Sequence, residues 1–158
     1  MKYMKIAVSG VPGTGKTKLC SYLKDEGFQT VNLNILAENL GCLMGEEVDI
    51  DCLNGKFKPE SEIVMDGHYS HLMDPFCVII TECSGETLRK RLEERGYGEN
   101  KIRENMDVLL FDSIYDESLE YVPSNRILKV STESPYDEED LRRIRNFINR
   151  MEEKFNGP

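Results

Sequence analysis

Short apolar runs alternate with longer segments of mixed polarity along most of the chain. Each run has the length and the polar borders of a buried β-strand. They are YMKIAV, FQTVNL, EIVMD, FCVIITE and RILKV. Between them we predict helices over residues 16–25, 34–41, 85–95 and 100–121. Five strands that alternate with helices predict one domain over residues 1–158, with an α/β fold of three layers around a parallel sheet.

Local signals mark where two of the predicted helices begin and end. Ser84 can cap the helix over residues 85–95, and Gly96 ends it. Near the C-terminus, Ser134 and Pro135 predict the start of a last helix. The apolar positions of that helix repeat at three and four residues, as one buried face requires. They are Leu141, Ile144, Ile148, Met151 and Phe155.

A glycine-rich loop joins the first strand to the first helix. GVPGTGKT, residues 10–17, matches the pattern G-x-x-x-x-G-K-[S/T] of a phosphate-binding loop, or P-loop. Its bare backbone lets N–H groups face phosphate oxygens, Lys16 can reach the terminal phosphates, and the Thr17 hydroxyl can bind Mg²⁺. The predicted nucleotide-binding residues of this stretch are Gly10, Pro12, Gly13, Thr14, Gly15, Lys16, Thr17 and Lys18.

A carboxylate at the end of a neighbouring strand often holds the hydrated magnesium ion of a P-loop protein. Asp66 ends the run EIVMD, and the spacing Asp-x-His puts His68 on the same side of an extended chain. We predict that Asp66 binds magnesium and that His68 contacts the phosphates or the attacking group. A strand-end turn for Asp66 and a structural role for His68 stay open, and His71 is interpreted as structural.

Two arginines offer positive charge for phosphoryl transfer. Arg91 and Arg95 lie four residues apart on the predicted helix, just before the Gly96-Tyr97 break. One hypothesis makes both catalytic, with Arg95 also binding the nucleotide at a mobile lid. The alternative is a solvated face on which Arg91 pairs with Glu94 and Arg95 with Glu99.

Composition limits the classes of partner. With 29 acidic and 20 basic residues, the formal charge of −9 argues against an extensive nucleic-acid surface and suits a small phosphorylated ligand or a basic protein. The apolar runs are far shorter than a membrane span, and no signal peptide is evident, which predicts a cytoplasmic protein, or a nuclear one in a eukaryote. The five cysteines lack C-x-x-C spacing, so we expect reduced, structural thiols.

The motifs together resemble those of a known family. GVPGTGKT, DGHYSHL and LEERGYGENKIRENM are similar to segments of the small adenylate-kinase-like ATPase family, which includes the human coilin-interacting nuclear ATPase protein and archaeal adenylate-kinase-like proteins. The resemblance runs from Met4 to about Tyr121. It implies a nucleoside-monophosphate-kinase-like fold, an acceptor-binding region at about residues 32–62 and a short lid at about 95–102.

The resemblance also has functional implications. It implies ATP binding, magnesium, adenylate kinase activity (ATP and AMP to two ADP), ATPase activity and a role in maturation of the small ribosomal subunit through a ribosomal protein. A basic ribosomal protein would suit the acidic surface. An ATPase switch, or a nucleotide-dependent binding module with little turnover, remains an alternative to a kinase.

The chain departs from the family at the acceptor site. It has no arginine before Arg89, although adenylate kinases commonly use one to bind the acceptor phosphate. Lys24, Lys56 and Lys58 are the candidate replacements, but lysine lacks the bidentate fork of arginine. The segment between Cys52 and Glu62 also looks too short for the usual helix of this region. We therefore expect AMP to be held more loosely than ATP.

Overall fold

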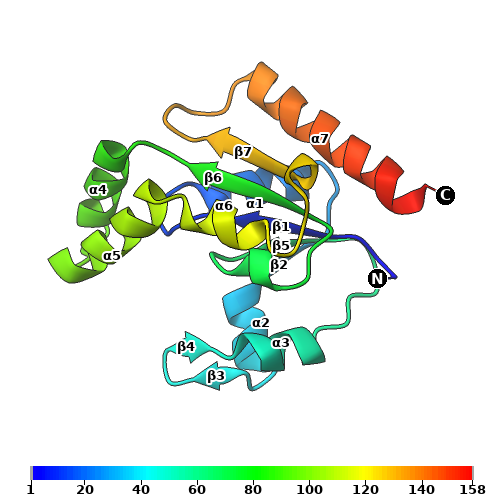
Figure 1. Ribbon diagram of the computed structural model, residues 1–158, viewed down its shortest axis with the longest axis horizontal. Helices are drawn as coiled ribbons and strands as arrows, with labels where there is room; N and C mark the ends of the chain where they lie inside the picture. The colour runs from blue at the N-terminus through cyan, green and yellow to red at the C-terminus, as the bar shows by residue number, and fades with distance from the viewer. Residues whose placement is uncertain (1, 158) are drawn as a thin grey trace.

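The core of the protein is a parallel sheet of five strands. The computed structural model describes residues 2–157 and orders the strands β2-β5-β1-β6-β7 (Figure 1). Every pairing in this sheet is parallel, with Val8 of β1 facing Asp66 of β5. The five strands are β1 (Lys5–Ser9), β2 (Thr30–Asn32), β5 (Ile63–Asp66), β6 (Cys77–Glu82) and β7 (Ile127–Ser131). The α/β fold predicted from the apolar runs is confirmed.

Helices cover both faces of the sheet and give the molecule three layers (Figure 1). Alternate residues of β1 point to opposite faces, so Ile6 and Val8 lie in one apolar cluster and Ala7 in the other. The first cluster packs against α1 (Lys16–Asp25) and α7 (Glu138–Asn156). The second packs against α2 (Leu33–Asn39), α3 (Ile50–Lys56), α4 (Gly85–Glu94), α5 (Glu99–Leu110) and α6 (Ser113–Ser118).

The helix expected over residues 100–121 is two helices. Asp112 has φ of 55°, in the left-handed region, and separates α5 from α6. Aspartate tolerates this conformation better than most residues, and Lys129 of β7 binds its carboxylate at 2.5 Å. The prediction of one long helix was wrong. The break depends on the backbone conformation of Asp112 and on its ion pair with Lys129, and the spacing of apolar residues along the chain reveals neither.

The last helix begins later than Ser134. The side chain of Asp137 accepts a hydrogen bond from the N–H of Asp140, and the carboxylate of Asp140 accepts one from the N–H of Asp137. This reciprocal capping box starts α7 at Glu138. Ser134 and Pro135 belong instead to the loop between β7 and α7, so the predicted start of this helix was wrong.

The segment between β2 and β5 contains more structure than its sequence suggested. We call residues 33–56 the α2–α3 segment. It holds α2, a small antiparallel hairpin of β3 (Leu43–Met44) and β4 (Glu47–Val48), and α3. The helix α3 does form, since Asp49 caps it through the N–H of Cys52. The segment projects below the sheet in Figure 1.

The cysteines differ from the expectation of five reduced thiols. Cys42 and Cys52 form a disulfide within the α2–α3 segment, and Cys20, Cys77 and Cys83 are free. The pairing was missed because the two residues meet only when the hairpin folds back. Within residues 2–157, no helix combines the length and the apolar character that a membrane span needs.

Candidate nucleotide site

The P-loop lies at the carboxyl edge of the sheet, between β1 and α1. Gly10, Gly13 and Gly15 have φ of 147°, 91° and 90° respectively, a region that side chains rarely adopt. A Cβ on Gly10 would also collide with the Thr81 side chain of β6. The side chain of Thr14 points inward, where its hydroxyl donates to the Val11 carbonyl at 2.6 Å. The glycines thus allow a loop that turns sharply against the neighbouring strand.

Lys16 starts α1 and folds back over the loop. Its Nζ donates to the carbonyl oxygens of Gly10 at 2.8 Å and Val11 at 3.1 Å. Burial lowers the pKa of Lys16 to about 8, against the opposing effect of the Asp66 carboxylate, while the charge of Arg95 lowers it further. The protein therefore stabilises the charged form of the ammonium group only weakly, and a bound phosphate group would stabilise it further.

Asp66 ends β5 beside β1, which places its carboxylate at the same edge as the P-loop. Burial raises the pKa of Asp66, and the charge of Lys16 opposes that rise. Thr17, the other predicted magnesium ligand, is exposed at the start of α1. A carboxylate and a hydroxyl are the kind of oxygen donors that Mg²⁺ accepts while it keeps water and phosphate ligands. The residues present therefore fit a magnesium ion.

His68 and His71 have different surroundings. His68 lies exposed at the surface next to Gly67, and loss of hydration, then the charge of Lys16, lowers its pKa. His71 is buried, with Nδ1 at 2.8 Å from Ser9 Oγ and Nε2 at 2.9 Å from the Glu117 carboxylate. His71 therefore links α6 to the end of β1, whereas His68 is the histidine that substrates can reach.

A cavity of about 850 Å³ opens next to the P-loop. It is lined by Gly13, Gly15, Lys16, Thr17, Lys18, Arg91, Glu94, Arg95 and residues 132–136. Its volume is within the range of small-molecule sites, and it lies at the carboxyl ends of the strands, where ligands of α/β proteins bind. The structure thus brings both predicted arginines to the predicted phosphate loop.

Arg91 is neither on a solvated face nor free to move. Its guanidinium donates to the carbonyl oxygen of Gly13 at 3.1 Å, and to the carbonyl and hydroxyl oxygens of Thr132 at 2.6 and 3.2 Å. It ties the P-loop to the loop after β7. The ion pairs that a solvated face would have, Arg91 with Glu94 and Arg95 with Glu99, do not occur among the described residues. Glu99 binds Arg89 and Arg103 instead. Arg95, which is exposed in the turn after α4, is the arginine available to a ligand.

The loop after β7 is a wall of the cavity that sequence reasoning missed. The carboxylate of Glu133 accepts from the Ser84 N–H at 2.8 Å, from the Ser84 hydroxyl at 2.9 Å and from the Thr87 hydroxyl. This holds residues 132–136 against the start of α4. The loop has no motif, so only its position at the carboxyl end of a strand of the parallel sheet could have pointed to it.

The lysines considered for the acceptor site lie in different parts of the structure. Lys56 donates to the Leu40 carbonyl at 2.9 Å. The charge of Lys58 lowers the pKa of Lys5, so Lys58 lies near the amino end of β1, away from the P-loop. Lys24 is in the last turn of α1. A smaller effect on the pKa of His68, after loss of hydration, Lys16 and His71, comes from Lys101 of α5, whose Nζ lies 4.8 Å from the ring centre of Tyr97. The role of Lys24, Lys56 and Lys58 at the acceptor site stays a prediction.

A glycine-rich loop that enters a helix at the carboxyl edge of a five-stranded parallel sheet defines a P-loop protein with a kinase fold. Solved structures agree on the fold: a gluconokinase from Sinorhizobium meliloti 1021 has a TM-score of 0.57 at 15% identity, covering 96% of this chain and 95% of that one. The YorR protein of Bacillus subtilis, in complex with phosphorylated GDP, has a TM-score of 0.59 at 16% identity, covering 96% and 98%.

Sequence comparison gives the family. Residues 6–112 match the AAA domain family. A protein of Thermoplasma acidophilum named "Putative adenylate kinase" is 44% identical over 79% of this chain and 85% of its own length, and one of Archaeoglobus fulgidus with the same name is 31% identical over 92% and 82%. The chain belongs to this adenylate-kinase-like family of P-loop proteins, and it is a phosphotransferase by class.

Proposed function

We propose that the protein is an adenylate kinase, which transfers the terminal phosphoryl group of ATP to AMP. The observation that carries the proposal is the cavity in which Lys16 of the P-loop meets Arg95. The name that its archaeal relatives share supports AMP as the acceptor. A phosphoryl transfer needs little covalent help from a protein, since positioning and positive charge supply most of the catalysis.

The donor nucleotide would lie along the P-loop, with its nucleoside between Arg95 and residues 132–136. Loop N–H groups and the start of α1 would hold the phosphates. Lys16 would exchange its two carbonyl partners for phosphate oxygens, which are charged and therefore stronger acceptors. Arg95 would stabilise the charge that develops on the transferred group.

Magnesium would be held by the Thr17 hydroxyl and, through water, by Asp66. A bound magnesium ion supplies positive charge to the terminal phosphates. Burial leaves the Asp66 carboxylate in a setting where a nearby positive charge favours its ionised form. His68, at the surface two residues after Asp66, would contact the attacking phosphate of AMP.

The test is the rate of ADP formation from ATP with and without AMP. An adenylate kinase should make two ADP for each ATP consumed, at a rate that saturates with AMP. Phosphate release should be measured in the same samples. Equal ADP and phosphate, at a rate indifferent to AMP, would instead identify an ATPase.

We also propose a second role, as an ATPase that acts on a basic protein of the small ribosomal subunit. The observation that favours it is a surface at the end of α5, where Leu110 is 64% and Phe111 73% exposed next to Asp107 and Asp112. Large apolar side chains bordered by carboxylates suit a basic partner. Small-subunit proteins should stimulate phosphate release by the wild-type protein and fail to stimulate a Phe111→Ser variant.

A further inference from the structure

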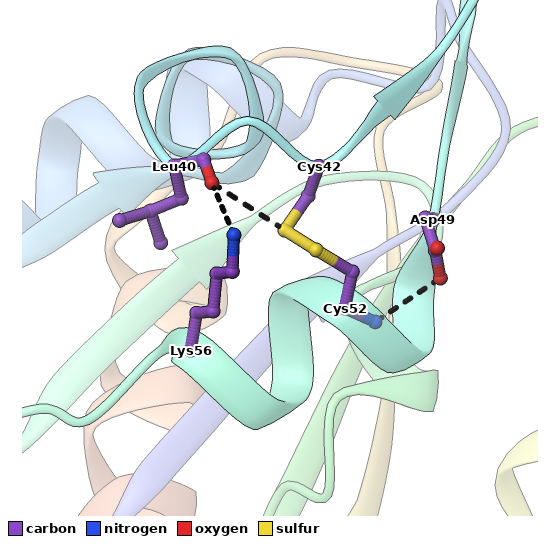
Figure 2. The surroundings of a disulfide bond; sticks show 5 residues. All are labelled: Leu40, Cys42, Asp49, Cys52 and Lys56. Atoms are coloured by element: carbon purple, nitrogen blue, oxygen red, sulfur yellow. Dashed lines mark hydrogen bonds between the residues drawn. A yellow bond between two sulfur atoms is a disulfide. The ribbon is translucent and has the colours of Figure 1, made fainter.

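The disulfide joins the two helices of the α2–α3 segment. Figure 2 shows Cys42, just after α2, bonded to Cys52 in the first turn of α3, with Cα atoms 5.6 Å apart. The bond closes a loop that contains the whole β3–β4 hairpin. Cys42 is 1% exposed, whereas Cys52 is only partly buried, so Cys52 is the half of the disulfide nearer to an external thiol.

Apolar packing and two hydrogen bonds also hold this loop closed. Leu53 of α3 is fully buried in the same apolar cluster as the buried face of α2. The N–H of Asp49 donates to the Cys42 carbonyl at 2.8 Å. Lys56 donates to the carbonyl of Leu40 at 2.9 Å, as Figure 2 shows. Each strand of the hairpin has two residues, which is too short for independent stability. The disulfide adds a covalent link to this packing and so limits how far α3 can move from α2.

The same segment borders the site of phosphoryl transfer. The Tyr69 hydroxyl donates to the Asn34 side chain of α2 at 2.8 Å. Leu33 packs against the Cα of Gly67, which lies between Asp66 and His68. One end of α2 is thus anchored at the site, and the other end is attached to the disulfide. A change in the bond would alter how the segment is held beside His68.

We propose that Cys42 and Cys52 form a thiol–disulfide exchange site whose oxidation state sets the affinity of the α2–α3 segment for the acceptor nucleotide. The proposal rests on AMP being the acceptor. The oxidised pair fixes the segment in one arrangement that binds AMP. The reduced pair leaves it in several arrangements, of which only a fraction bind, so the apparent affinity falls by that fraction.

The exchange needs only another dithiol or disulfide. In reduction, an external thiolate attacks the Cys52 sulfur, the S–S bond breaks, and Cys42 leaves with the electron pair and takes up a proton. A second external thiolate then attacks the external sulfur of the mixed disulfide and releases Cys52 as a thiolate, which takes up a proton. The two external thiols are thereby oxidised to a disulfide, and the two electrons they lose reduce the protein disulfide to two thiols. Oxidation by a disulfide such as oxidised glutathione is the reverse.

The other cysteines are poorly suited to this chemistry. Cys20 and Cys77 are buried, and burial raises the pKa of both thiols, which leaves very little of the reactive thiolate. Burial also raises the pKa of Cys83, which is half-buried. Exchange should therefore be selective for the Cys42–Cys52 pair among the five cysteines.

The experiment compares the full-length protein after oxidation by oxidised glutathione and after reduction by dithiothreitol. Alkylation under denaturing conditions should modify three cysteines in the oxidised protein and five in the reduced one. The KM for AMP should rise about tenfold on reduction if a tenth of the molecules remain competent, while the KM for ATP stays constant. The Cys42→Ser/Cys52→Ser double variant should behave as reduced under both conditions, and Cys83→Ser should respond like wild type.

Hydrogen exchange of the amides in residues 33–56 gives a readout that does not need AMP turnover. Faster exchange there on reduction, with no change in the P-loop, is expected. Equal exchange in the two states, or failure of glutathione to interconvert them, would overturn the proposal. Faster exchange with an unchanged KM for AMP would overturn its link to the acceptor. If neither state makes ADP from AMP, the proposed kinase function fails instead, and the thiol count and hydrogen exchange still decide whether the exchange site exists.

Discussion

At the scale of single residues, the site depends on positive charges that the protein's own groups compensate only in part. Lys16 binds two carbonyl oxygens and has a pKa of about 8, because burial outweighs the nearby Asp66. Arg91 is fully engaged with backbone and Thr132, whereas Arg95 is exposed. Side chains of the same charge at one cavity thus have different roles.

ATP binding should take up protons near pH 8. At that pH about half of the Lys16 side chains in the empty protein are neutral, and phosphate favours the charged form, so binding should draw about half a proton. Uptake should be small at pH 6.5, where Lys16 is already protonated, and affinity should fall as the pH rises above 8. Calorimetry in buffers of different ionisation enthalpy measures the uptake. A value independent of pH would contradict the assignment of Lys16 to the phosphates.

Arg91→Ala and Arg95→Ala should differ in kind. Loss of Arg91 removes the bonds between the P-loop and Thr132, so we expect about 1–3 kcal/mol lower unfolding free energy and a higher KM for ATP. Arg95→Ala should leave the stability unchanged and lower kcat. Arg89→Ala, on the same helix but paired with Glu99, is the control. Denaturant titration and initial rates test this, and equal stabilities for the Arg91 and Arg95 variants would argue against the distinction.

Asp66→Asn should raise the magnesium concentration needed for half-maximal rate and lower kcat, because an amide holds the hydrated ion less well than a carboxylate. Replacement of His68 should affect turnover more than ATP affinity. A suitable control is Asp51→Asn, which changes a carboxylate in the first turn of α3. Rates measured across a magnesium titration give the result. Curves that coincide for Asp66→Asn and wild type would return Asp66 to a structural role.

At the scale of elements, the boundaries of helices decide which residues are free to line the site. Because the capping box of Asp137 and Asp140 starts α7, Ser134 and Pro135 stay outside the helix and contribute to the cavity wall. The left-handed Asp112 similarly ends α5, after which α6 turns back to present Glu117 to His71.

The start of α7 can be tested by comparing two caps. Asp137→Ala should lower the free energy of unfolding by about 1 kcal/mol, since the first turn of the helix loses a hydrogen-bond acceptor. Ser134→Ala should leave it unchanged, because Ser134 lies outside the helix. Urea denaturation measures both. A larger loss for Ser134→Ala than for Asp137→Ala would place the start of the helix where the sequence first suggested it.

At the scale of the whole molecule, the donor and acceptor sides of the site differ in how they are built. The donor side combines the P-loop, α4 and the loop after β7, joined by Arg91 and Glu133. The acceptor side that we propose combines the α2–α3 segment with the start of α5, where Lys101 lies. Arg103 of α5 is paired with Glu99, so AMP should depend on lysine there and saturate the enzyme at higher concentration than ATP.

Lys101→Ala should raise the KM for AMP by about three- to tenfold, because an exposed lysine contributes a charged bond of modest strength to a phosphate. The KM for ATP should change little. Arg103→Ala, on the same exposed helix but paired with Glu99, is the matched control. Initial rates across an AMP titration at saturating ATP provide the measurement. If both variants had the same KM for AMP as wild type, the acceptor phosphate would have to bind elsewhere.

The sequence by itself determined the parallel sheet, the P-loop and the position of Asp66. The strands are continuous apolar runs, and the loop is a contiguous motif, so both are encoded in neighbouring residues. The end of the run EIVMD likewise placed Asp66 at the carboxyl end of a strand. Its position next to the loop then needed only β5 to pair with β1.

The tertiary structure alone decided how distant residues pair. Arg91 meets Gly13 and Thr132 across separations of 78 and 41 residues, which helical spacing could not reveal. Cys42 reaches Cys52 only through the hairpin, and the loop after β7 becomes a wall only because β7 lies beside β6 in the sheet. Local patterns report the hydrogen bonds and burial of neighbours in the chain, whereas these contacts depend on how whole elements pack.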